Sequence, residues 1–351
     1  MRKRSDELKD AVKFILTVEF WRMAVGWTLS LLVSYFHLFF LKPRPPLPRR
    51  SIADTTTSRP ICIITGATSG LGAAAALALS QEGFHVVLVG RSLDLIRKTM
   101  KHIKDRNEGA HLKAFQIDVS SMESVLKFKD ALNQWFLDSG VHSSVQLLIN
   151  NAGILSTSYR QTTEGFDQMM GTNYIGAFYL TKLLFPLLKS SPTPSRIVNV
   201  TSFTHRSVFH VDVHKGTVGG MWFSKFKQYP FAQIYGLSKL FMLLFSYKLH
   251  REHSSSQVSI IVVDPGAVKT NLLREVPSYL SYTAFVVLKL IGLLQSPEKG
   301  ARCIVDAALA PEEISGVYFF GGNGRTINST KLSYDSKLAE RLWSVTDDLI
   351  G

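Results

Sequence analysis

A glycine-rich turn between an apolar run and an alanine-rich segment is the feature that most constrains the fold of this chain. The run over 60–65 has no charged side chain, which predicts a strand buried on both faces of a sheet. The alanine-rich segment over 72–82 predicts a helix. Between them, Gly66, Gly70 and Gly72 let the backbone approach a pyrophosphate at the helix N-terminus, where free N–H groups favour anions. The junction therefore predicts a dinucleotide-binding α/β domain.

Apolar runs and helical segments continue to alternate along 59–325. Further strands are expected at 85–90, 112–117, 145–149, 196–200, 258–263 and 316–320, and helices at 93–107, 122–138, 164–189, 233–252 and 297–309. Strands that alternate with helices indicate parallel pairing through helical crossovers. The sequence therefore predicts an α/β fold with a single doubly wound parallel sheet of seven strands, followed by a tail helix within 326–351.

The end of the second strand indicates which nicotinamide cofactor the domain prefers. An acidic residue there would bind the ribose hydroxyls of NAD, but the strand ends in Gly90 and Arg91. Because a guanidinium suits a 2′-phosphate, the sequence favours NADP(H) over NAD(H). A solvated loop charge is the alternative interpretation of Arg91. Asp118 and Val119 follow the third strand and are placed to meet the adenine.

A tyrosine and a lysine four residues apart, Tyr235 and Lys239, lie within the helix expected at 233–252. This spacing places both side chains on one face of the helix, one turn apart. A neighbouring ammonium lowers the phenol pKa from its ordinary value of about 10, which suits proton transfer near neutral pH. Ser202, at an upstream strand end, is placed to hold a carbonyl or alkoxide oxygen against the tyrosine. Alone, the pair also fits a surface tyrosine packed over a lysine stem, but the other motifs favour catalysis.

The N-terminal part of the chain predicts an attachment to a membrane. The first 59 residues hold eleven of the 40 basic and five of the 27 acidic residues, so nearly half of the net charge of +13 lies there. A charged amphipathic start is expected over 1–22, an anchor helix over 23–41 and a Pro/Arg-rich linker over 42–58. The anchor run of nineteen residues lacks Asp, Glu, Lys and Arg and approaches the about 20 residues that cross a bilayer. Both a transmembrane helix and a helix lying in one leaflet remain open.

Two further segments are expected to shape a substrate pocket. The interval 203–232 is rich in aromatic residues, which fits either a loop over a pocket for a bulky apolar substrate or a peripheral flap with its own small core. The interval 270–296 carries a second apolar stretch that Pro277, Lys289 and Gly292 interrupt. We expect it to form a lid over the pocket rather than a second membrane span.

Taken together, these motifs resemble the short-chain dehydrogenase/reductase (SDR) family in its single-domain type. The matches run in the family's order across about residues 58–325: Thr65-Gly66-x-x-x-Gly70-x-Gly72, Asp118, Asn151-Ala152-Gly153, Asn173, Ser202, Tyr235-x-x-x-Lys239 and Pro265-Gly266. The asparagine and serine strand ends and the N-terminal anchor are similar to the retinol-dehydrogenase and WW-domain-oxidoreductase group. The C-terminal part resembles an X-linked dehydrogenase/reductase member and the plant Tic32 proteins of the chloroplast envelope.

The resemblance implies a Rossmann-like fold and a role for each matching residue. Tyr235 would be the catalytic acid/base, Lys239 would lower its pKa and bind the nicotinamide ribose, and Ser202 would position the substrate oxygen. Asn173 would hold the water of a proton relay to Lys239. The cofactor would be bound by Gly66, Thr68, Ser69, Gly70, Leu71, Gly72, Arg91, Asp118, Val119, Asn151, Ala152, Gly153, Tyr235, Lys239, Pro265, Gly266, Val268 and Thr270. The interval from Ser202 to Tyr235 is longer than is usual for the family, so the resemblance does not define the pocket.

These inferences lead us to expect a membrane-anchored, NADP(H)-dependent oxidoreductase. It would interconvert a lipophilic alcohol of retinoid, sterol or long-chain prenyl type and its aldehyde or ketone. The Tic32 resemblance implies a second hypothesis, an NADP(H)-sensing component of a membrane complex. We expect no metal and no nucleic-acid partner, because no zinc-ligand spacing, basic helix or RNA-binding motif is present. The endoplasmic reticulum is the first expectation for the membrane, the chloroplast envelope and mitochondrial membrane are alternatives, and a homodimer is left open.

Overall fold

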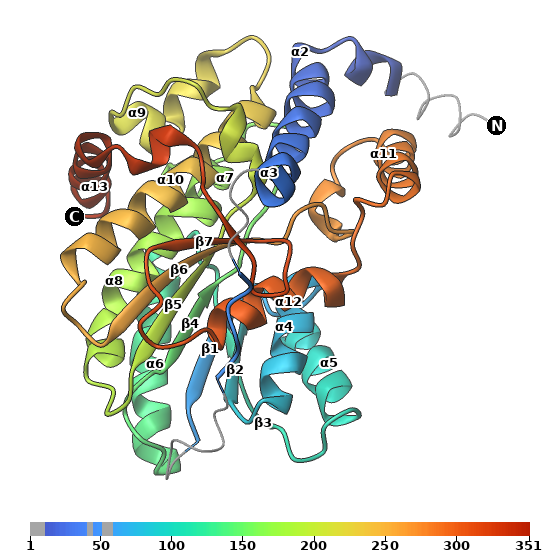
Figure 1. Ribbon diagram of the computed structural model, residues 1–351. Helices are drawn as coiled ribbons and strands as arrows, with labels where there is room; N and C mark the ends of the chain where they lie inside the picture. The colour runs from blue at the N-terminus through green and yellow to red at the C-terminus, as the bar shows by residue number, and fades with distance from the viewer. Residues whose placement is uncertain (1–10, 41–44, 51–58) are drawn as a thin grey trace.

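The protein is built around one central β-sheet, seen in the computed structural model, which describes residues 11–40, 45–50 and 59–351 (Figure 1). The strand order is β3-β2-β1-β4-β5-β6-β7-β8. The strands are β1 (Ile61–Thr65), β2 (His85–Gly90), β3 (His111–Gln116), β4 (Leu147–Asn150), β5 (Ser195–Val200), β6 (Val258–Asp264), β7 (Val317–Phe320) and β8 (Thr326–Ile327). The first seven pair in parallel, as in the doubly wound sheet predicted from the sequence. The prediction missed β8, which has two residues and pairs antiparallel with β7.

Helices cover both faces of the sheet because successive strand residues point to opposite sides. Ile61 and Ile63 pack into one core with α6, α8 and α10, whereas Cys62 and Ile64 pack into another with α4, α5 and α12 (Figure 1). The covering helices are α4 (Gly70–Gln81), α5 (Leu93–Lys104), α6 (Met122–Ser139), α8 (Gly176–Lys189), α10 (Phe231–Glu252) and α12 (Pro297–Ala308). The tail helix α13 (Ser336–Ile350) packs outside α10. Burial on both faces explains why the parallel strands were readable as continuous apolar runs.

Short helices fill the connections near the carboxyl edge of the sheet. They are α7 (Gln168–Met170), η2 (Gly171–Ile175), η3 (Phe203–Ser207), α9 (Lys215–Val218), η4 (Met221–Lys225), η5 (Asn271–Leu273) and η6 (Lys331–Tyr334). The longer helix α11 (Ser278–Leu290) lies within the segment expected to form a lid. The first two, α7 and η2, lead directly into α8, so the helix expected at 164–189 is present but contains a π-helical turn.

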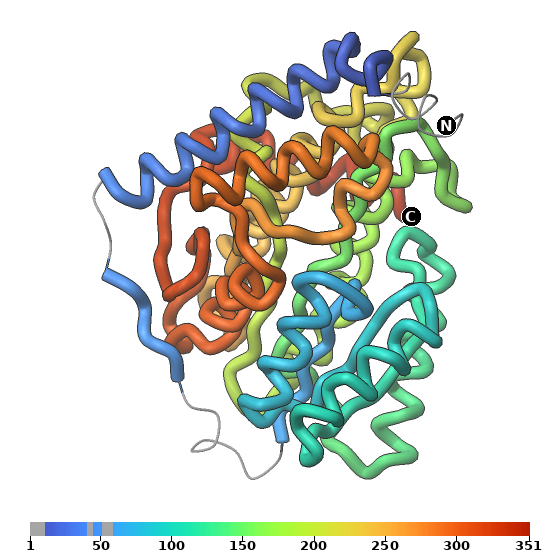
Figure 2. The backbone as a smooth tube through the Cα atoms, turned by 90° about the vertical axis from the view of Figure 1, so that its right-hand side faces the viewer, coloured from blue at the N-terminus to red at the C-terminus, as the bar shows by residue number. Residues whose placement is uncertain are grey.

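The N-terminal apolar segment is one continuous helix, built of α2 (Val18–Trp21), η1 (Arg22–Trp27) and α3 (Thr28–Phe40). In the described part of the chain, it is the one helix that is long and apolar enough to cross a membrane. It lies along the α/β domain beside α11, as Figure 2 shows with the blue and orange tubes. Leu31, Leu38 and Tyr35 pack into a cluster with residues of β6, β7 and α11.

Part of the expected N-terminal organisation lies outside the described residues, namely the charged start at 1–10 and the linker at 41–44 and 51–58. The linker residues 45–50 run along the domain. The Leu47 amide donates a hydrogen bond to Gly324 O (2.9 Å), and Arg49 Nε donates one to Asp306 Oδ1 (2.7 Å). This part of the linker is therefore attached to the domain surface.

Candidate active site

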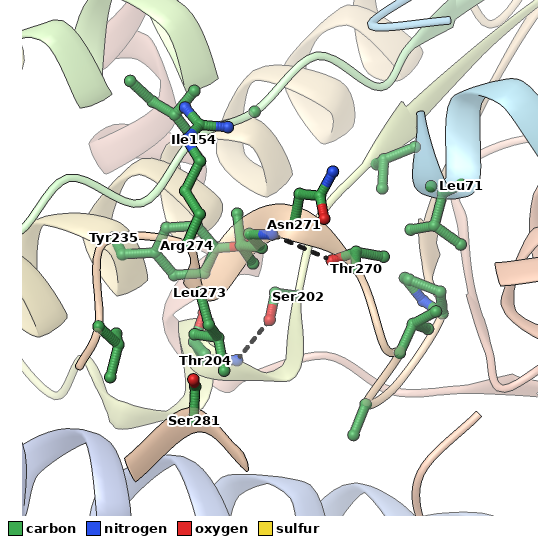
Figure 3. Close-up of a pocket in the computed structure, with 18 of the residues that line it drawn as sticks. Leu71, Ile154, Ser202, Thr204, Tyr235, Thr270, Asn271, Leu273, Arg274 and Ser281 are labelled. Carbon is green, nitrogen blue, oxygen red and sulfur yellow. Dashed lines mark hydrogen bonds between the residues drawn. The ribbon is translucent and has the colours of Figure 1, made fainter. Parts of the chain in front are cut away.

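A cavity of about 600 Å³ lies at the carboxyl edge of the sheet (Figure 3). This is the edge at which open α/β sheets bind their ligands. The cavity is lined by residues that follow β1, β2, β3, β4, β5 and β6. All the site residues predicted from the sequence line this cavity, except Gly72 and Asn173, which lie behind its wall.

The turn after β1 has the shape of a phosphate cradle. Gly66 and Gly70 have φ of 67° and 53°, a region that side-chain-bearing residues rarely adopt. A Cβ on Gly72 would lie 2.3 Å from Gly66 O, so only glycine allows the turn to pack this closely. Asn151 holds the turn from the neighbouring strand end, because its Nδ2 donates to Thr65 O across 2.8 Å. The α4 N-terminus thus presents a bare backbone surface that fits a dinucleotide pyrophosphate.

The residues expected to meet the adenosine part of a cofactor follow β2 and β3 and line the cavity there. Arg91 is exposed at the end of β2, and Gln116 Nε2 donates to its carbonyl oxygen across 3.0 Å. Asp118 Oδ1 accepts hydrogen bonds from the Ser120 amide (3.0 Å) and hydroxyl (2.7 Å), which fixes its orientation. Val119 lines the cavity beside it. Arg91, Asp118 and Val119 thus line the part of the cavity at the ends of β2 and β3.

Ser202, Tyr235 and Lys239 meet at the centre of the cavity, and Figure 3 shows the Ser202 and Tyr235 side chains within it. Tyr235 and Lys239 lie one turn apart on α10, and Lys239 Nζ is 5.6 Å from the Tyr235 ring centroid. The Nζ also donates to Val200 O across 3.2 Å, at the end of β5. Both side chains are buried, so the cation and the phenol are held together away from bulk water.

A buried carboxylate, Asp264, adds negative charge behind this group. Burial raises its pKa to about 6, against the opposing effects of hydrogen bonds from Tyr318 and the Gly266 amide. Burial and the Asp264 charge raise the pKa of Tyr235 above its ordinary value, while a hydrogen bond with Ser202 lowers it. Burial lowers the pKa of Lys239 to about 8, and Asp264 acts in the opposite direction. The phenol pKa thus shifts opposite to the expectation from Lys239 alone, because burial and Asp264 dominate.

Asn173 lies behind the cavity in the π-helical turn η2, a distortion that is frequent at functional sites. Its Nδ2 donates to Ile154 O (3.0 Å) and Ser238 Oγ (3.2 Å), and its Oδ1 accepts from the Ile154 amide (2.8 Å). A Cβ on Gly153 would lie 3.5 Å from both Asn173 Oδ1 and Lys239 Nζ. The Asn173 side chain therefore lies near Lys239. It also links α10, through Ser238, to Ile154 in the segment that follows β4.

His205, which no sequence pattern indicated, contacts the backbone of Ser202. His205 is buried, and burial lowers its pKa to about 3. Its Nδ1 donates to Ser202 O across 2.7 Å, and its Nε2 accepts from the Thr330 amide across 3.2 Å. A neutral imidazole with the proton on Nδ1 satisfies both bonds. His205 thus fixes the backbone from which the Ser202 hydroxyl projects.

The N-terminal helix also contributes to the site, which the sequence did not predict. Met23, Trp27 and Leu31 recur every four residues and line the cavity. The Trp27 ring lies 5.4 Å from the Tyr235 ring, centroid to centroid. Glu19 lies one turn before Met23 and is buried. It accepts a hydrogen bond from the Ala232 amide (3.0 Å), at the start of the helix that carries Tyr235. The apolar helix is therefore part of the wall of the active site.

The two segments expected to shape the pocket differ in how much of the cavity wall they form. From η5 and α11, the side chains of Leu272, Leu280, Ala284 and Leu288 line the cavity, as a lid would. The aromatic interval contributes only Phe203 and Thr204 at its beginning. Three of its other rings, Trp222, Phe223 and Phe226, pack against one another, whereas Phe209 is exposed. The interval is therefore mostly peripheral to the cavity, but its buried residues Val218 and Phe223 belong to the main core of the domain rather than to a small core of their own.

Comparisons with known proteins agree with this geometry. The family model described as short chain dehydrogenase matches residues 60–212. A polyprenol dehydrogenase from Homo sapiens is 31% identical over 89% of this chain and 88% of its own, and human retinol dehydrogenase 13 is 31% identical over 82% and 84%. The chloroplastic short-chain dehydrogenase TIC 32 A from Brassica napus is 32% identical over 82% and 88%.

Solved structures share the fold as well. An uncharacterized protein from Mycobacterium paratuberculosis superimposes with a TM-score of 0.63 at 25% identity, over 86% of this chain and 98% of its own. The fold agrees with the family that the relatives identified by sequence indicate. The chain belongs to the short-chain dehydrogenase/reductase family, whose fold binds a nicotinamide cofactor.

Proposed function

We propose that this protein is an NADP(H)-dependent oxidoreductase, associated with a membrane, that interconverts a lipophilic alcohol and its aldehyde or ketone. The observation that carries the proposal is a single cavity with two chemically different parts. One part combines the glycine cradle with Arg91, and the other is walled by apolar side chains of the N-terminal helix and α11. Ser202 and Tyr235 lie between them, where a carbonyl group would react.

The residues of this chain fit the cofactor through the cradle that a Cβ at Gly72 would fill. The cradle from Gly66 to Leu71 would hold the pyrophosphate, Arg91 the 2′-phosphate, and Lys239 the nicotinamide ribose. The bound cofactor supplies the hydride for the carbonyl carbon. Selectivity for NADP(H) follows from the charge of Arg91, because guanidinium groups bind phosphate with paired hydrogen bonds.

Tyr235, Ser202 and Lys239, at the centre of the cavity, would carry out the acid–base chemistry. In the reducing direction, the Tyr235 hydroxyl donates a proton to the carbonyl oxygen, while the Ser202 hydroxyl donates a hydrogen bond to the same atom. The raised pKa of Tyr235 keeps the phenol protonated, as a proton donor must be. In the oxidising direction, the cationic Lys239 stabilises the phenolate that accepts the alcohol proton.

The substrate class follows from the walls of the cavity. Met23, Trp27 and Leu31 face it from one side, and Leu280 and Leu288 from the other. Apolar walls of this extent fit a long or polycyclic hydrocarbon with one oxygen at its end. Relatives named for polyprenol and retinol carry substrates of this chemistry in their names and support the proposal.

A second candidate is a component that binds NADP(H) without turnover and reports its state to a membrane complex. The resemblance to the TIC 32 proteins favours it. The two candidates differ in what they require from Tyr235, because binding needs the cradle but only turnover needs the phenol proton.

The deciding experiment measures NADPH oxidation by the full-length protein in detergent against a panel of apolar aldehydes and ketones. Tyr235→Phe is expected to lower kcat by about 10²–10⁴-fold while NADPH binding is retained. Tyr247→Phe is the matched control, since Tyr247 lies on the same helix, bonds to Ser329 and is absent from the cavity lining. NADPH binding without turnover on any compound would support the second candidate instead.

A further inference from the structure

Two neighbouring helices, the N-terminal helix Val18–Phe40 and α11, lie on the same side of the protein (Figure 2). Both carry exposed large apolar side chains. On the first, Leu29 is 56% and Phe36 52% exposed, and on the second, Leu290 is 81% exposed. Exposed apolar surface of this extent marks a contact with a ligand, a protein or a membrane. We name the exposed large apolar residues of these two helices the apolar rim: Val18, Trp21, Val25, Leu29, Leu32, Val33, Phe36, Phe39 and Phe40 on the first, and Tyr279, Tyr282, Val286, Val287 and Leu290 on the second.

The apolar rim surrounds a mouth of the active-site cavity. Thr28 on the N-terminal helix, and Val287 and Ile291 at α11, both line the cavity and are exposed to solvent. The cavity therefore opens between the two helices. In Figure 3, Ser281 from α11 points toward the part of the cavity that holds Ser202 and Tyr235.

The N-terminal helix is tied to the domain along most of its length. Near its start, Glu19 is 3% exposed and accepts from the Ala232 amide, and Arg22 Nη1 donates to Gln233 Oε1 across 3.2 Å. Near its end, Ser34 Oγ accepts from Arg206 Nε across 2.9 Å, and Leu38 is buried. At 1.5 Å per residue, the contacts from Glu19 to Leu38 extend along about 28 Å of helix.

This distance decides between the two membrane arrangements. A hydrocarbon core is about 30 Å thick, so a helix that crosses it while keeping these contacts would carry the domain into the bilayer with it. The exposed charged side chains of the domain forbid that. A helix that lies flat in one leaflet keeps all the contacts and buries only its outward face.

The charges near the rim fit a lipid surface. Arg274 and Lys289 are exposed beside or on α11. The nearby acids are neutralised, because Glu19 is buried and paired with Arg22 (2.5 Å), and Glu275 is paired with Arg160. Cations beside an apolar face suit the anionic headgroups of a membrane.

We propose that the apolar rim lies within one leaflet of a bilayer, with the N-terminal helix parallel to the membrane plane, and that the cavity mouth opens into the acyl region. Lipophilic substrate would then enter the site from the lipid without passing through water. The route of substrate rests on the proposed function, whereas the arrangement of the two helices does not.

Single-cysteine labelling tests this arrangement, because the chain has two cysteines, Cys62 and Cys303, and both are buried. Single cysteines replace Val18, Leu29 and Phe40 along the N-terminal helix and Tyr282 and Leu290 on α11. Each is labelled with an environment-sensitive fluorophore, and the full-length protein is bound to phosphatidylcholine–phosphatidylserine vesicles that carry shallow or deep spin-labelled lipids as quenchers. Leu137→Cys is the matched control, since Leu137 is 75% exposed on α6, outside the rim.

A flat helix predicts strong quenching by the shallow label at all five rim sites, to a similar extent, and none at residue 137. A spanning helix would place residue 29 nearest the deep label and residues 18 and 40 near opposite surfaces, with no quenching on α11, and this pattern would overturn the proposal. If the rim sites were shielded from both lipid quenchers and the protein sedimented with twice its mass, the rim would be an interface with a second copy of the chain. That result would also overturn the proposal. The readout needs no turnover, so an inactive protein with the flat pattern would count against the proposed function alone.

Discussion

The indole ring of Trp27 lies 5.4 Å from the phenol ring of Tyr235, centroid to centroid, although 208 residues separate them in the chain. The helix that sequence reasoning assigned to the membrane thus provides a wall of the cavity. The catalytic domain without this helix would have an open site. The contact links the N-terminal segment to the chemistry at Tyr235.

Replacing Trp27 tests this link. Trp27→Ala removes the ring that covers Tyr235, so we expect kcat/KM for bulky apolar carbonyl substrates to fall about tenfold or more, while the affinity for NADPH stays unchanged. Steady-state kinetics and a fluorescence titration with NADPH measure the two effects. Trp21→Ala is the control, since Trp21 is exposed on the same helix and absent from the cavity lining. Equal losses in both variants would contradict a specific role of Trp27.

Glu19 is expected to position the catalytic helix. Its carboxylate accepts the Ala232 amide, one of the N–H groups at the start of α10 that lack a partner within the helix. Glu19→Ala should lower stability by about 1 kcal/mol and reduce kcat, whereas Glu19→Gln keeps an acceptor oxygen and should recover most of kcat. Thermal unfolding and kcat measured together check this. Loss of stability with an unchanged kcat would limit Glu19 to a structural role.

Much of the fold could be predicted because the strands leave a local pattern. Ile61 to Thr65 is buried on both faces, so it reads as an unbroken apolar run, and the glycines that follow are required by backbone geometry. Gly66, Arg91 and Asn151 could be placed at the cavity for the same reason, because each follows a strand that ends at one edge of the sheet. Tyr235 and Lys239 were readable from helical spacing alone.

The remaining features depend on contacts that local patterns do not contain. Glu19 meets Ala232 across 213 residues of chain, and nothing in the sequence around either residue indicates the bond. Asp264 directly precedes Pro265, and no local pattern indicates that its carboxylate is buried and accepts a hydrogen bond from Tyr318. Hydropathy also failed to distinguish a helix that crosses a bilayer from one that packs along a domain, because both require an apolar face.

Arg91 is expected to select the cofactor. Arg91→Ala removes the guanidinium at the end of β2, so KM for NADPH should rise by about tenfold to a hundredfold, while KM for NADH changes little. Parallel kinetics with the two cofactors give the comparison. Arg97→Ala serves as the control, because Arg97 is an exposed residue of α5 paired with Asp94. An equal change with both cofactors would argue against a bond to the 2′-phosphate.

Gly72 is expected to be essential for the cradle. In Gly72→Ala, the added Cβ would meet Gly66 O at 2.3 Å and Asn151 Nδ2 at 2.6 Å, so the turn must shift. We expect a loss of about 1–3 kcal/mol in stability and at least tenfold weaker NADPH binding. Gly109→Ala is the matched control, because its nearest neighbour would be Asn107 Oδ1 at 3.8 Å. Calorimetric titration with NADPH would contradict the cradle if both variants bound equally well.

Asp264 is expected to set the alkaline limit of carbonyl reduction. Its negative charge raises the pKa of both Tyr235 and Lys239, and it is present above pH about 6, where the buried carboxyl ionises. Asp264→Asn removes the charge but keeps an oxygen to accept from Tyr318. Both pKa values should then fall, so the phenol proton and the ammonium charge are lost at lower pH. The alkaline limb of kcat/KM for NADPH-dependent reduction should therefore shift to lower pH.

The control for this shift is Asp306→Asn. Asp306 is also a buried carboxylate, but it accepts from Arg49 (2.7 Å) and the Gly324 amide (3.0 Å), outside the cavity. Its replacement should lower stability and leave the pH profile in place. A limb that stayed fixed in Asp264→Asn, or moved to higher pH, would mean that the Asp264 charge does not act on the proton donor, and that burial alone sets the pKa of Tyr235.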